Sequence, residues 1–431
     1  MVKELKHTEI GDIPVDWELQ TFDETFRVIS NNTLSRENLN NRGGAVRNIH
    51  YGDILTKFPE VLDCNEEEIP YVNELSLLSS STQLLQDGDI VVADTAEDET
   101  VGKVTEVQNL GDSKLVAGLH TIPCRVKKGD FAPGWLGYYM NSDLFHNQIL
   151  PYITGIKVSS ISKGAISETL ILVPPFDEQE KIVQSLNKIQ LLMTSETKVV
   201  NKIKLVKNGC LSKMFPQKDD TVPEMRLPGF TEAWEQRKFS DCYKMSSGYA
   251  FKMSDYCDEG VGLINGESIQ HGIINDDNLN HLPEFFIQQY PEFLLKENDI
   301  VVGLNRPITN GNLKIARIPS KYNDSLLYQR AGKIVYKTDC DKDFTYVLLS
   351  QEILKHTLVE AVGSDQPFIS TSKLDGWKMM MPSNMEEQVK IGEYFQNLDH
   401  LITLHQCKCD KYSNIKKGMM SDLLTGKIRL V

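Results

Sequence analysis

Two stretches of the chain carry apolar side chains at alternating intervals of three and four residues, the pattern of a helix that buries one face against another helix. Every position of the second stretch lies 209 residues after its counterpart in the first. Each series predicts a helix of about 37 residues, roughly 55 Å long at 1.5 Å per residue. Both also share one irregular interval, near Ile203 and Tyr412. We therefore predict a duplicated coiled-coil helix. Its first copy is Ile182, Leu186, Ile189, Met193, Glu196, Val200, Ile203, Val206, Cys210 and Met214, and its second is Ile391, Phe395, Leu398, Ile402, His405, Cys409, Tyr412, Ile415, Met419 and Leu423.

One position of this helical seam is polar in both copies. Glu196 occupies it in the first helix and His405 in the second. A polar residue in a coiled-coil seam fixes the register of the helices at some cost in stability. We interpret both residues as register-setting, and we expect no metal-binding or nucleophilic role for His405.

A strand-rich block precedes each predicted helix. Short β-branched runs at residues 90–92 and 300–302 each follow a polar turn, which is the pattern of a buried strand. Prolines at 174–175 and at 382 end the last strand of each block and begin the helix. The sequence thus predicts an α+β protein with a pseudo-twofold internal repeat. Its parts are a first domain at 1–175, a central helix at 176–215, a linker at 216–225, a second domain at 226–382 and a C-terminal helix at 383–431.

Charge is distributed unevenly over these parts. The chain carries a net charge of −14. Residues 1–175 hold 14 Lys and Arg against 26 Asp and Glu, whereas residues 176–215 hold 7 against 4. Acidic domains exclude non-specific adhesion to phosphate as the way this protein works. Any binding of DNA is therefore expected to use local patches, with a partner that supplies further positive charge.

No catalytic motif is found in the sequence. Val173-Pro174-Pro175-Phe176 has valine where an amino methyltransferase motif needs Asn or Asp, so we interpret the prolines as strand terminators. The phosphate-loop, His-Glu-x-x-His and Gly-x-Ser-x-Gly patterns are all missing. The eight cysteines lack the spacing of disulfide or zinc frameworks, and no apolar run is long enough for a membrane span. We expect a cytoplasmic protein that is not an enzyme.

The duplicated helix starts carry a family resemblance. Each strand-rich block leads into a helix opened by Pro-x-x-x-Glu-Gln-x-x-Ile, with Glu178-Gln179 in one copy and Glu387-Gln388 in the other. The domains begin with Ile-Pro-x-x-Trp17 and with Leu-Pro-Gly-Phe-x-x-x-Trp234. Together with the closing run of residues 418–428, these features resemble the specificity subunit of Type I restriction–modification enzymes over essentially the whole chain.

The resemblance implies a specific division of labour. Each block would be a target recognition domain for one half of a bipartite DNA sequence, and the helices would form an antiparallel coiled coil that sets the gap between the half-sites. Two methyltransferase subunits and the restriction subunits would be the protein partners, bound to double-stranded DNA together with this chain. S-adenosylmethionine, ATP and Mg²⁺ would belong to those partners, with no cofactor or metal in this chain. Eight seam residues are expected to join the helices and to dock subunits: Ile182, Leu186, Ile189, Met193, Ile391, Phe395, Leu398 and Ile402.

Candidate readers of DNA are polar side chains on glycine-rich or strand-end loops. Arg suits guanine, and Asn or Gln suits adenine. In the first domain the stretch 40–51 is the best candidate, and in the second domain the loop 305–314 is; for both, the simpler interpretation is a solvated turn. The first-domain candidates are Arg42, Arg47, Asn48, His50, Tyr51, His120 and Lys157, and the second-domain candidates are Asn305, Arg306, Asn310, Asn312, Lys314, Gln329, Arg330 and Gln366.

Two other functions remain open from the sequence. The acidic blocks also suit a coiled-coil scaffold or assembly adaptor that binds proteins instead of DNA. A recognition subunit of a combined methyltransferase–nuclease system would have similar domains but other partners.

Overall fold

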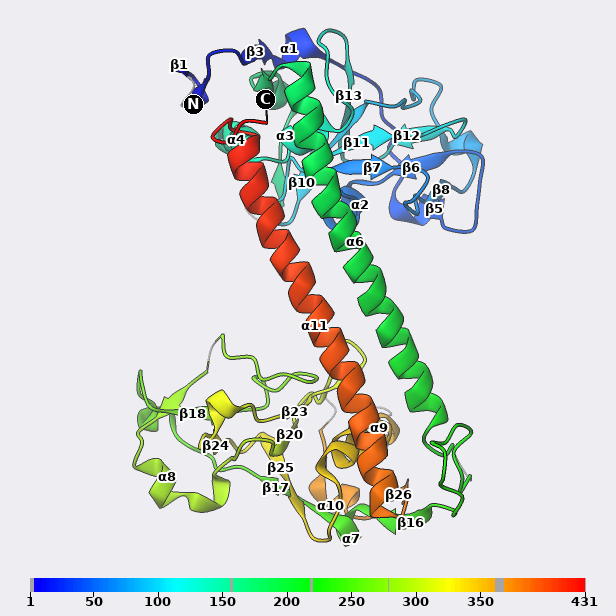
Figure 1. The fold of residues 1–431 in the computed structure, drawn as a ribbon, viewed down its shortest axis with the longest axis vertical. Coiled ribbons are helices and arrows are strands. Elements are labelled where there is room, and N and C mark those ends of the chain that lie inside the picture. The colour runs from blue at the N-terminus through cyan, green and yellow to red at the C-terminus, as the bar shows by residue number, and fades with distance from the viewer. Residues whose placement is uncertain (1–3, 156–157, 218–219, 278, 361–367, 431) are drawn as a thin grey trace. The chain divides into compact units, whose positions relative to one another are not determined.

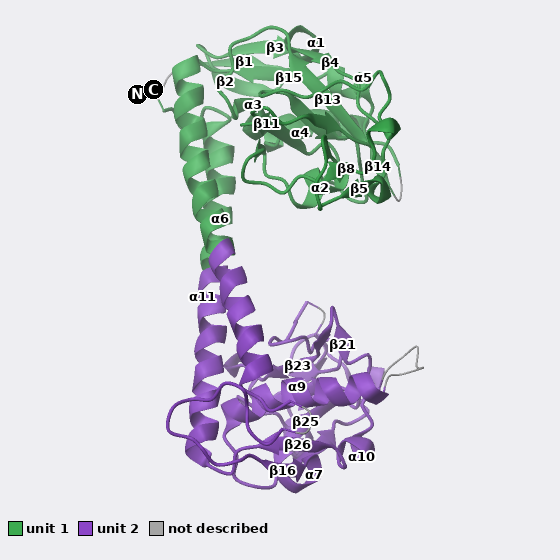
Figure 2. Cartoon of the chain, turned by 90° about the vertical axis from the view of Figure 1, so that its right-hand side faces the viewer, with its two compact units in different colours: residues 1–197, 407–431 green, residues 198–406 purple. Residues whose placement is uncertain are grey.

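The computed structural model describes residues 4–155, 158–217, 220–277, 279–360 and 368–430. The chain forms two compact units, residues 1–197 with 407–431 and residues 198–406 (Figure 2). Each unit contains one strand-rich domain and a segment of each of two long helices, α6 (Phe176–Lys213) and α11 (Met385–Leu423) (Figure 1). The α+β class and the internal repeat predicted from the sequence are confirmed.

The domain of unit 1 contains two sheets. The five-stranded sheet has the order β4-β13-β9-β11-β7, and the four-stranded sheet has the order β12-β6-β8-β5. Strand β9, which the β-branched pattern predicted, is buried in the centre of the first sheet. The strands are β4 (Phe26–Val28), β5 (Leu39–Asn40), β6 (Arg47–Ile49), β7 (Val61–Asp63), β8 (Tyr71–Val72), β9 (Ile90–Ala93), β11 (Val104–Gln108), β12 (Leu115–Ala117) and β13 (Thr121–Val126). The domain also contains the short helices α2 (Tyr51–Thr56), α3 (Trp135–Tyr139), α4 (Asp143–Ile149) and α5 (Lys163–Ser167). Its remaining strands form three pairs: β1 (Leu5–Thr8) with β2 (Gly11–Pro14), β10 (Thr95–Ala96) with β14 (Ser159–Ser160), and β3 (Glu18–Thr21) with β15 (Leu170–Val173).

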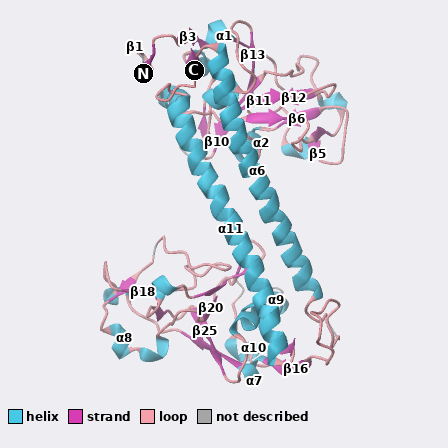
Figure 3. Cartoon of the chain, viewed as in Figure 1, coloured by secondary structure: helices cyan, strands magenta, loops and turns pink. Residues whose placement is uncertain are grey.

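The domain of unit 2 repeats this plan with fewer strands. Its main sheet has the order β17-β25-β20-β23, and β18 pairs in parallel with β24 as β6 does with β12. Figure 3 shows the strands and helices of the domain. The elements are α7 (Phe239–Cys242), β17 (Tyr243–Ser247), β18 (Val261–Ile264), β19 (His281–Leu282), α8 (Phe286–Gln289), β20 (Ile300–Gly303), β21 (Ile308–Thr309), β22 (Asn312–Leu313), β23 (Ile315–Arg317), β24 (Leu326–Leu327), β25 (Ala331–Tyr336), α9 (Lys342–Glu360) and α10 (Thr371–Leu374), with β16 (Glu235–Lys238) paired to β26 (Lys378–Met381).

The two long helices pack antiparallel in each unit. In unit 1 Gln190 Oε1 accepts a hydrogen bond from Lys416 Nζ at 2.7 Å, and Glu196 forms an ion pair with Lys408 at 3.6 Å. In unit 2 Lys207 Nζ lies 2.5 Å from Asp399 Oδ1. A second contact in unit 2 joins Cys210 to Tyr394 at 3.1 Å. Within each unit the number of the α11 partner falls as the residue number along α6 rises, which confirms the predicted antiparallel coiled coil.

The seam differs from the predicted one at a single position in each helix. Val206 and Ile415, predicted in the seam, are 45% and 40% exposed, whereas the neighbouring Lys207 is half-buried and Lys416 is buried. With the lysines in place of the apolar residues, both series keep an unbroken heptad interval, so the helices contain no stutter. The lysines are tolerated because each has a polar partner, which is the condition for burying a charge.

Lys416 also joins α11 to the first domain. Its Nζ atom donates to Glu60 Oε2 at 2.6 Å and lies 5.3 Å from the centre of the Tyr138 ring. Its counterpart Lys207 pairs with Asp399, which stands 209 residues after Gln190. The acidic partner therefore comes from the globular domain in unit 1 and from the opposite helix in unit 2.

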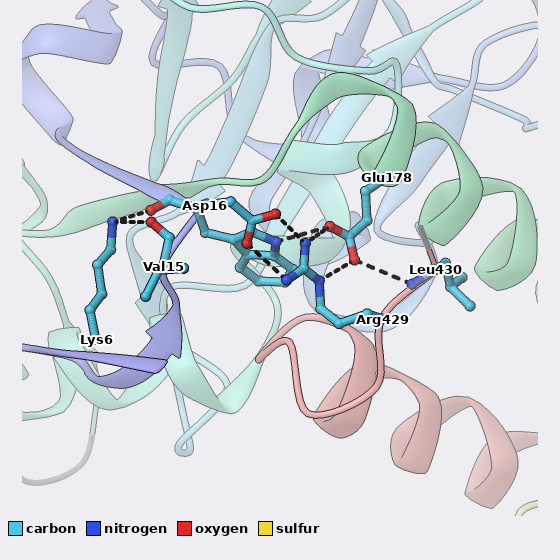
Figure 4. Close-up of polar contacts among 7 residues, drawn as sticks. Lys6, Val15, Asp16, Glu178, Arg429 and Leu430 are labelled. Carbon is cyan, nitrogen blue, oxygen red and sulfur yellow. Dashed lines mark hydrogen bonds and ion pairs between the residues drawn. The ribbon is translucent and has the colours of Figure 1, made fainter. Parts of the chain in front are cut away.

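The Glu-Gln pair at each helix start fastens the helix to its domain. In unit 1, Glu178 accepts hydrogen bonds from the Trp17 indole at 3.0 Å and from Arg429, whose guanidinium also binds Asp16 (Figure 4). Gln179 accepts from Ala132 N–H and donates to the Pro174 carbonyl. We call the group of Asp16, Trp17, Glu178 and Arg429 the first clasp.

A second clasp occupies the matching place in unit 2. Glu387 accepts a hydrogen bond from the Trp234 indole at 3.2 Å and forms a bidentate ion pair with Arg226, in which both N···O distances are 2.7 Å. Ala233 stands where the first clasp has Asp16, and Arg226 Nη1 has no hydrogen-bond partner among the described residues. Arg226 follows the end of α6 and Arg429 follows the end of α11, so each clasp ties the end of one helix to the start of the other.

All eight cysteines are free thiols. Of the helices in the described ranges, none is long and apolar enough to cross a membrane. Within the same ranges, no group of three or more His, Cys, Asp or Glu side chains is placed to hold a metal ion.

Candidate nucleic-acid interface

Several predicted readers of the first domain meet where β9 ends and β13 begins. His120 precedes β13, and its Nδ1 atom lies 3.4 Å from Asp94 Oδ1, just beyond β9. The Tyr51 ring, at the start of α2, makes an edge contact with His120 at 5.2 Å between centroids, and His50 lies 4.6 Å from Tyr51. Because the side chains come from separate strand ends, folding brings together residues that are distant in sequence. We call His50, Tyr51, Asp94, Thr95 and His120 the first strand-edge site.

The imidazole of His50 is held neutral in this site. Its Nδ1 atom accepts a hydrogen bond from Gly52 N–H at 3.1 Å, so the ring proton of the neutral form is on Nε2. Burial lowers the pKa of His50, and the charge of Arg36 lowers it further. The Nε2–H group is therefore a donor at neutral pH.

Two predicted readers lie inside the first domain. Arg47 is buried and donates to the Cys64 carbonyl at 2.6 Å, and Asn48 is buried with its Oδ1 atom bonded to Asn32. Strand β6, which carries both, pairs with β12 and β8 and has both faces covered. The structure therefore does not favour Arg47 or Asn48 as base contacts, because neither side chain reaches the surface.

The predicted stretch 40–51 is not one loop. Arg42 is exposed on the turn before β6, where Asn40 Oδ1 accepts from the backbone N–H groups of Arg42 and Gly43. His50 and Tyr51 follow the other end of that strand. Arg42 thus lies apart from the first strand-edge site, and Lys157 lies outside the described residues.

The second domain presents an exposed two-stranded hairpin at its predicted loop. Strands β21 and β22 pair antiparallel, and Asn310 and Gly311 between them both have positive φ, as in a type I′ turn. Asn310 and Asn312 are exposed, whereas Lys314, just after the hairpin, is half-buried and donates to the Gly266 carbonyl. A β-ribbon of this kind fits the major groove of DNA.

Arg306, at the base of the hairpin, has an unusual backbone. It is exposed, has φ of +44° and precedes Pro307. Only a few per cent of non-glycine residues adopt positive φ, and the following proline restricts the backbone further. Strain of this kind is concentrated at functional sites. The observation supports Arg306 as a functional residue.

The remaining second-domain candidates are Asn305, Gln329, Arg330 and Gln366. Gln329 and Arg330 are exposed just before β25, and Asn305 forms a bridge to Phe368. Gln366 lies outside the described residues. We call Asn265, Asn305, Arg306 and Arg330 the second strand-edge site.

Backbone hydrogen bonds show that the two strand-edge sites are equivalent. Asp94 N–H donates to the His120 carbonyl at 3.1 Å, as Leu304 N–H donates to the Arg330 carbonyl at 3.0 Å. The N–H group of residue 161 donates to the Asp94 carbonyl, and that of residue 369 donates to the Leu304 carbonyl. Likewise Gly118 bonds to Ile49 as Tyr328 bonds to Ile264. The register pairs His50 with Asn265, Asp94 with Leu304, Thr95 with Asn305, and His120 with Arg330.

The sequence did not point to Asp94, Thr95 or Asn265. Asp94 and Thr95 directly follow the buried run 90–93, and polar residues at the end of a predicted strand were the signal available. Asn265 also follows a buried strand, β18, and its Oδ1 atom accepts from two backbone N–H groups in the next turn.

Two duplicated domains, each with an equivalent polar site at its strand ends, define a two-headed recognition protein. A sequence model described as "Type I restriction modification DNA specificity domain" matches residues 14–205 and 231–411. The chain belongs to this family of specificity subunits, whose role is recognition of DNA sequence.

Relatives in two organisms are similar to this chain. It is 31% identical to the Type I restriction enzyme MjaVIII specificity subunit of Methanocaldococcus jannaschii over 64% of the chain and 66% of that protein. With the putative MjaX specificity subunit of the same organism the identity is 25% over 99% of the chain and 96% of that protein. With the EcoAI specificity subunit of Escherichia coli it is 30% over 46% of the chain and 34% of that protein.

Solved structures share the fold at low sequence identity. The S subunit of a Type I restriction–modification system from M. genitalium superimposes with a TM-score of 0.56 and 14% identity, covering 98% of this chain and 99% of that chain. A chain from the structure described as "Structural basis underlying complex assembly and conformational transition of the type I R-M system" gives a TM-score of 0.53 and 13% identity, covering 96% and 99%.

Proposed function

We propose that this chain reads a bipartite double-stranded DNA target, one half with each domain, and directs adenine methyltransferase and restriction subunits to it. The observation that carries the proposal is the strand-edge site, which occurs twice in the same backbone framework with different side chains. A duplicated framework suits two readers, and different side chains suit two different half-sites. The helix pair sets the length of the unread gap.

The chain itself supplies recognition and no chemistry. S-adenosylmethionine, ATP and Mg²⁺ belong to the partner subunits. The acidic domains agree with this division, because partner subunits then provide much of the positive charge around the DNA.

Exposed apolar side chains on the helices support docking of two methyltransferase subunits. The predicted docking residues Ile182, Leu186, Ile391 and Phe395 are instead buried in the cores of the units. Outside the seam, several apolar side chains of the helices are exposed, including Leu191, Leu205 and Leu404, and one pair in each unit occupies positions that recur in the repeat. Leu192 (46%) and Ile415 (40%) form it in unit 1, and Val206 (45%) and Leu401 (40%) form it in unit 2.

These pairs are copies of each other. Leu401 lies 209 residues after Leu192, and Ile415 lies 209 residues after Val206. All four precede the same heptad position of the seam, and on antiparallel helices such positions flank the seam on one side. Exposed apolar patches mark sites of protein association. Two equivalent patches suit two identical partners.

A selection experiment tests the proposal. The purified chain, with and without its methyltransferase subunit, is mixed with a random duplex library, and the bound DNA is sequenced. We expect one motif of two short half-sites with a constant gap. If the complex enriches no sequence but still assembles with partner proteins, the chain is an assembly scaffold and the proposal fails.

Disrupting the exposed pairs should reduce subunit assembly. Changing Leu192 and Leu401 to Asp places a charge in each docking patch, and we expect the affinity for the methyltransferase subunit to fall more than about tenfold, since burying an unpaired charge is costly. Titration monitored by light scattering measures this loss. Met253→Asp is the control, because Met253 is 85% exposed but lies in the second domain. Full assembly by the double variant would contradict the assignment.

A further inference from the structure

The two strand-edge sites differ in charge although their backbones match. The first site pairs its basic side chain internally, because His120 lies against Asp94 and Thr95 Oγ1 lies 3.3 Å from His120 Nδ1. The second site has Leu304 at the position of Asp94 and Arg330 at the position of His120. The carboxylate of Asp94, which contacts the basic side chain of the first site, is thus replaced in the second site by the buried apolar side chain of Leu304.

Arg306 and Arg330 are two of four exposed arginines, with Arg27 and Arg42, whose side chains have no partner among the described residues, and of these four they alone belong to a strand-edge site. Most arginines are engaged with carboxylates: Arg36, Arg125, Arg226, Arg237, Arg317 and Arg429. Within the described ranges, the guanidinium groups of Arg306 and Arg330 form no hydrogen bond or ion pair. Their backbones are nevertheless fixed, since Leu304 N–H bonds to the Arg330 carbonyl and Asn305 bridges to Phe368.

An exposed arginine without a partner, held on an ordered strand end, is prepared for an external acceptor. The planar guanidinium donates two parallel hydrogen bonds, and guanine offers the matching acceptors N7 and O6 in the major groove. The adjacent β21–β22 hairpin has a shape that this groove admits. Phosphate is the other acceptor open to arginine, but it carries no sequence information.

We infer that Arg330 selects a guanine in the half-site read by the second domain, and that Arg306 anchors the DNA backbone beside it. The first domain cannot make the same contact at its equivalent position, because His120 is engaged by Asp94. The two half-sites therefore follow different base rules at matched positions of the two readers. This inference rests on the proposed function and deepens it.

Library selection with variants of the assembled complex tests the inference. In wild-type selections we expect one position of a half-site to be guanine. Arg330→Gln should relax that position alone, reducing the preference for guanine roughly ten- to a hundredfold, the range expected for loss of a bidentate contact. Arg330→Lys should also relax the preference for guanine at that position while preserving the salt dependence of binding. Lysine keeps the positive charge but lacks the planar guanidinium that donates two parallel hydrogen bonds.

Arg306 and a control arginine complete the design. Arg306→Gln should weaken binding to all sequences alike and reduce the salt dependence by about one counterion. Arg27→Gln is the control, because Arg27 is exposed on β4 and belongs to neither strand-edge site, and it should leave the selected motif unchanged.

The outcomes separate this inference from the proposed function. If the wild-type complex selects no sequence, the proposed function fails. If the wild type selects a bipartite motif and Arg330→Gln selects the same motif with equal stringency, only the assignment of Arg330 is wrong. The assignment of Arg330 would also be overturned if Arg330→Gln relaxed the same half-site that variants of the first domain change.

Discussion

Reversing the charge of both Arg306 and Lys314 should abolish binding to the target while assembly with the methyltransferase subunits is retained. Both residues flank the exposed β21–β22 hairpin, which is the element of the second domain best shaped to enter a groove. Replacing two cations by glutamates removes two attractive contacts with phosphate or base and adds two repulsive charges. We expect the dissociation constant to rise at least about a hundredfold in a gel-shift at fixed salt, because each lost ionic contact also weakens binding through counterion release.

A matched variant controls for net charge. Lys244→Glu with Lys378→Glu makes the same change in charge on exposed strand residues of β17 and β26, where neither lysine has a side-chain partner within the described ranges. This variant should bind DNA nearly as the wild type does. Equal losses in the two double variants would show that overall charge, and not the hairpin, governs binding.

Removing the carboxylate of either clasp should cause the largest loss of stability. Glu387→Gln leaves Arg226 mostly buried without its ionic partner, and breaking a buried pair in this way costs about 3–5 kcal/mol. The expected result is a lower free energy of unfolding of unit 2, measured by denaturant titration. Glu386→Gln is the control one residue earlier, because Glu386 pairs with Lys390 on the surface, where such a pair contributes less than about 1 kcal/mol.

The first clasp should also make unit 1 sensitive to acid. Burial would raise the pKa of Glu178, but hydrogen bonds from Arg429 and Trp17 outweigh it and hold the pKa below the ordinary value. A lowered carboxyl pKa contributes stability at pH above 4.5, and this contribution is lost as the pH falls through the folded-state value. The Glu178→Gln variant should therefore lose stability less steeply than the wild type below pH 4.5. Parallel acid profiles of the two proteins would contradict this role for Glu178.

The sequence was sufficient for the architecture because its strongest signals are periodic. The repeat of Glu178-Gln179 at Glu387-Gln388 located both helix starts, and the structure explains the motif: Glu binds Trp and Arg, whereas Gln binds backbone groups of the domain. The arginines of the clasps could not be found in this way. Arg226 and Arg429 follow segments of different length after their helices, so they do not recur at the interval of the repeat.

The helix seam and the DNA-reading residues could not be predicted fully from the sequence, for a different reason. A hydrophobic pattern assigns the seam to Val206 and Ile415, and only the positions of Asp399, Gln190 and Glu60 show that the neighbouring lysines can be buried there. Similarly, the polar stretch 40–51 is continuous in sequence but is divided by strand β6. Asn48 looked like a reader because of its residue type, yet the two faces of that strand are both covered.

The first clasp also bears on the order in which the protein can mature during synthesis. Unit 1 includes residues 407–431, and Leu423 and Leu424 belong to the same apolar core as Trp17 and Ile182. The first domain leaves the ribosome early, but its core stays incomplete until Arg429 and the residues before it have been made and have bound Glu178 and Asp16. A stop codon just before the codon of Arg429 would therefore damage the first domain, while the second domain, translated in between, would retain all of its own segments.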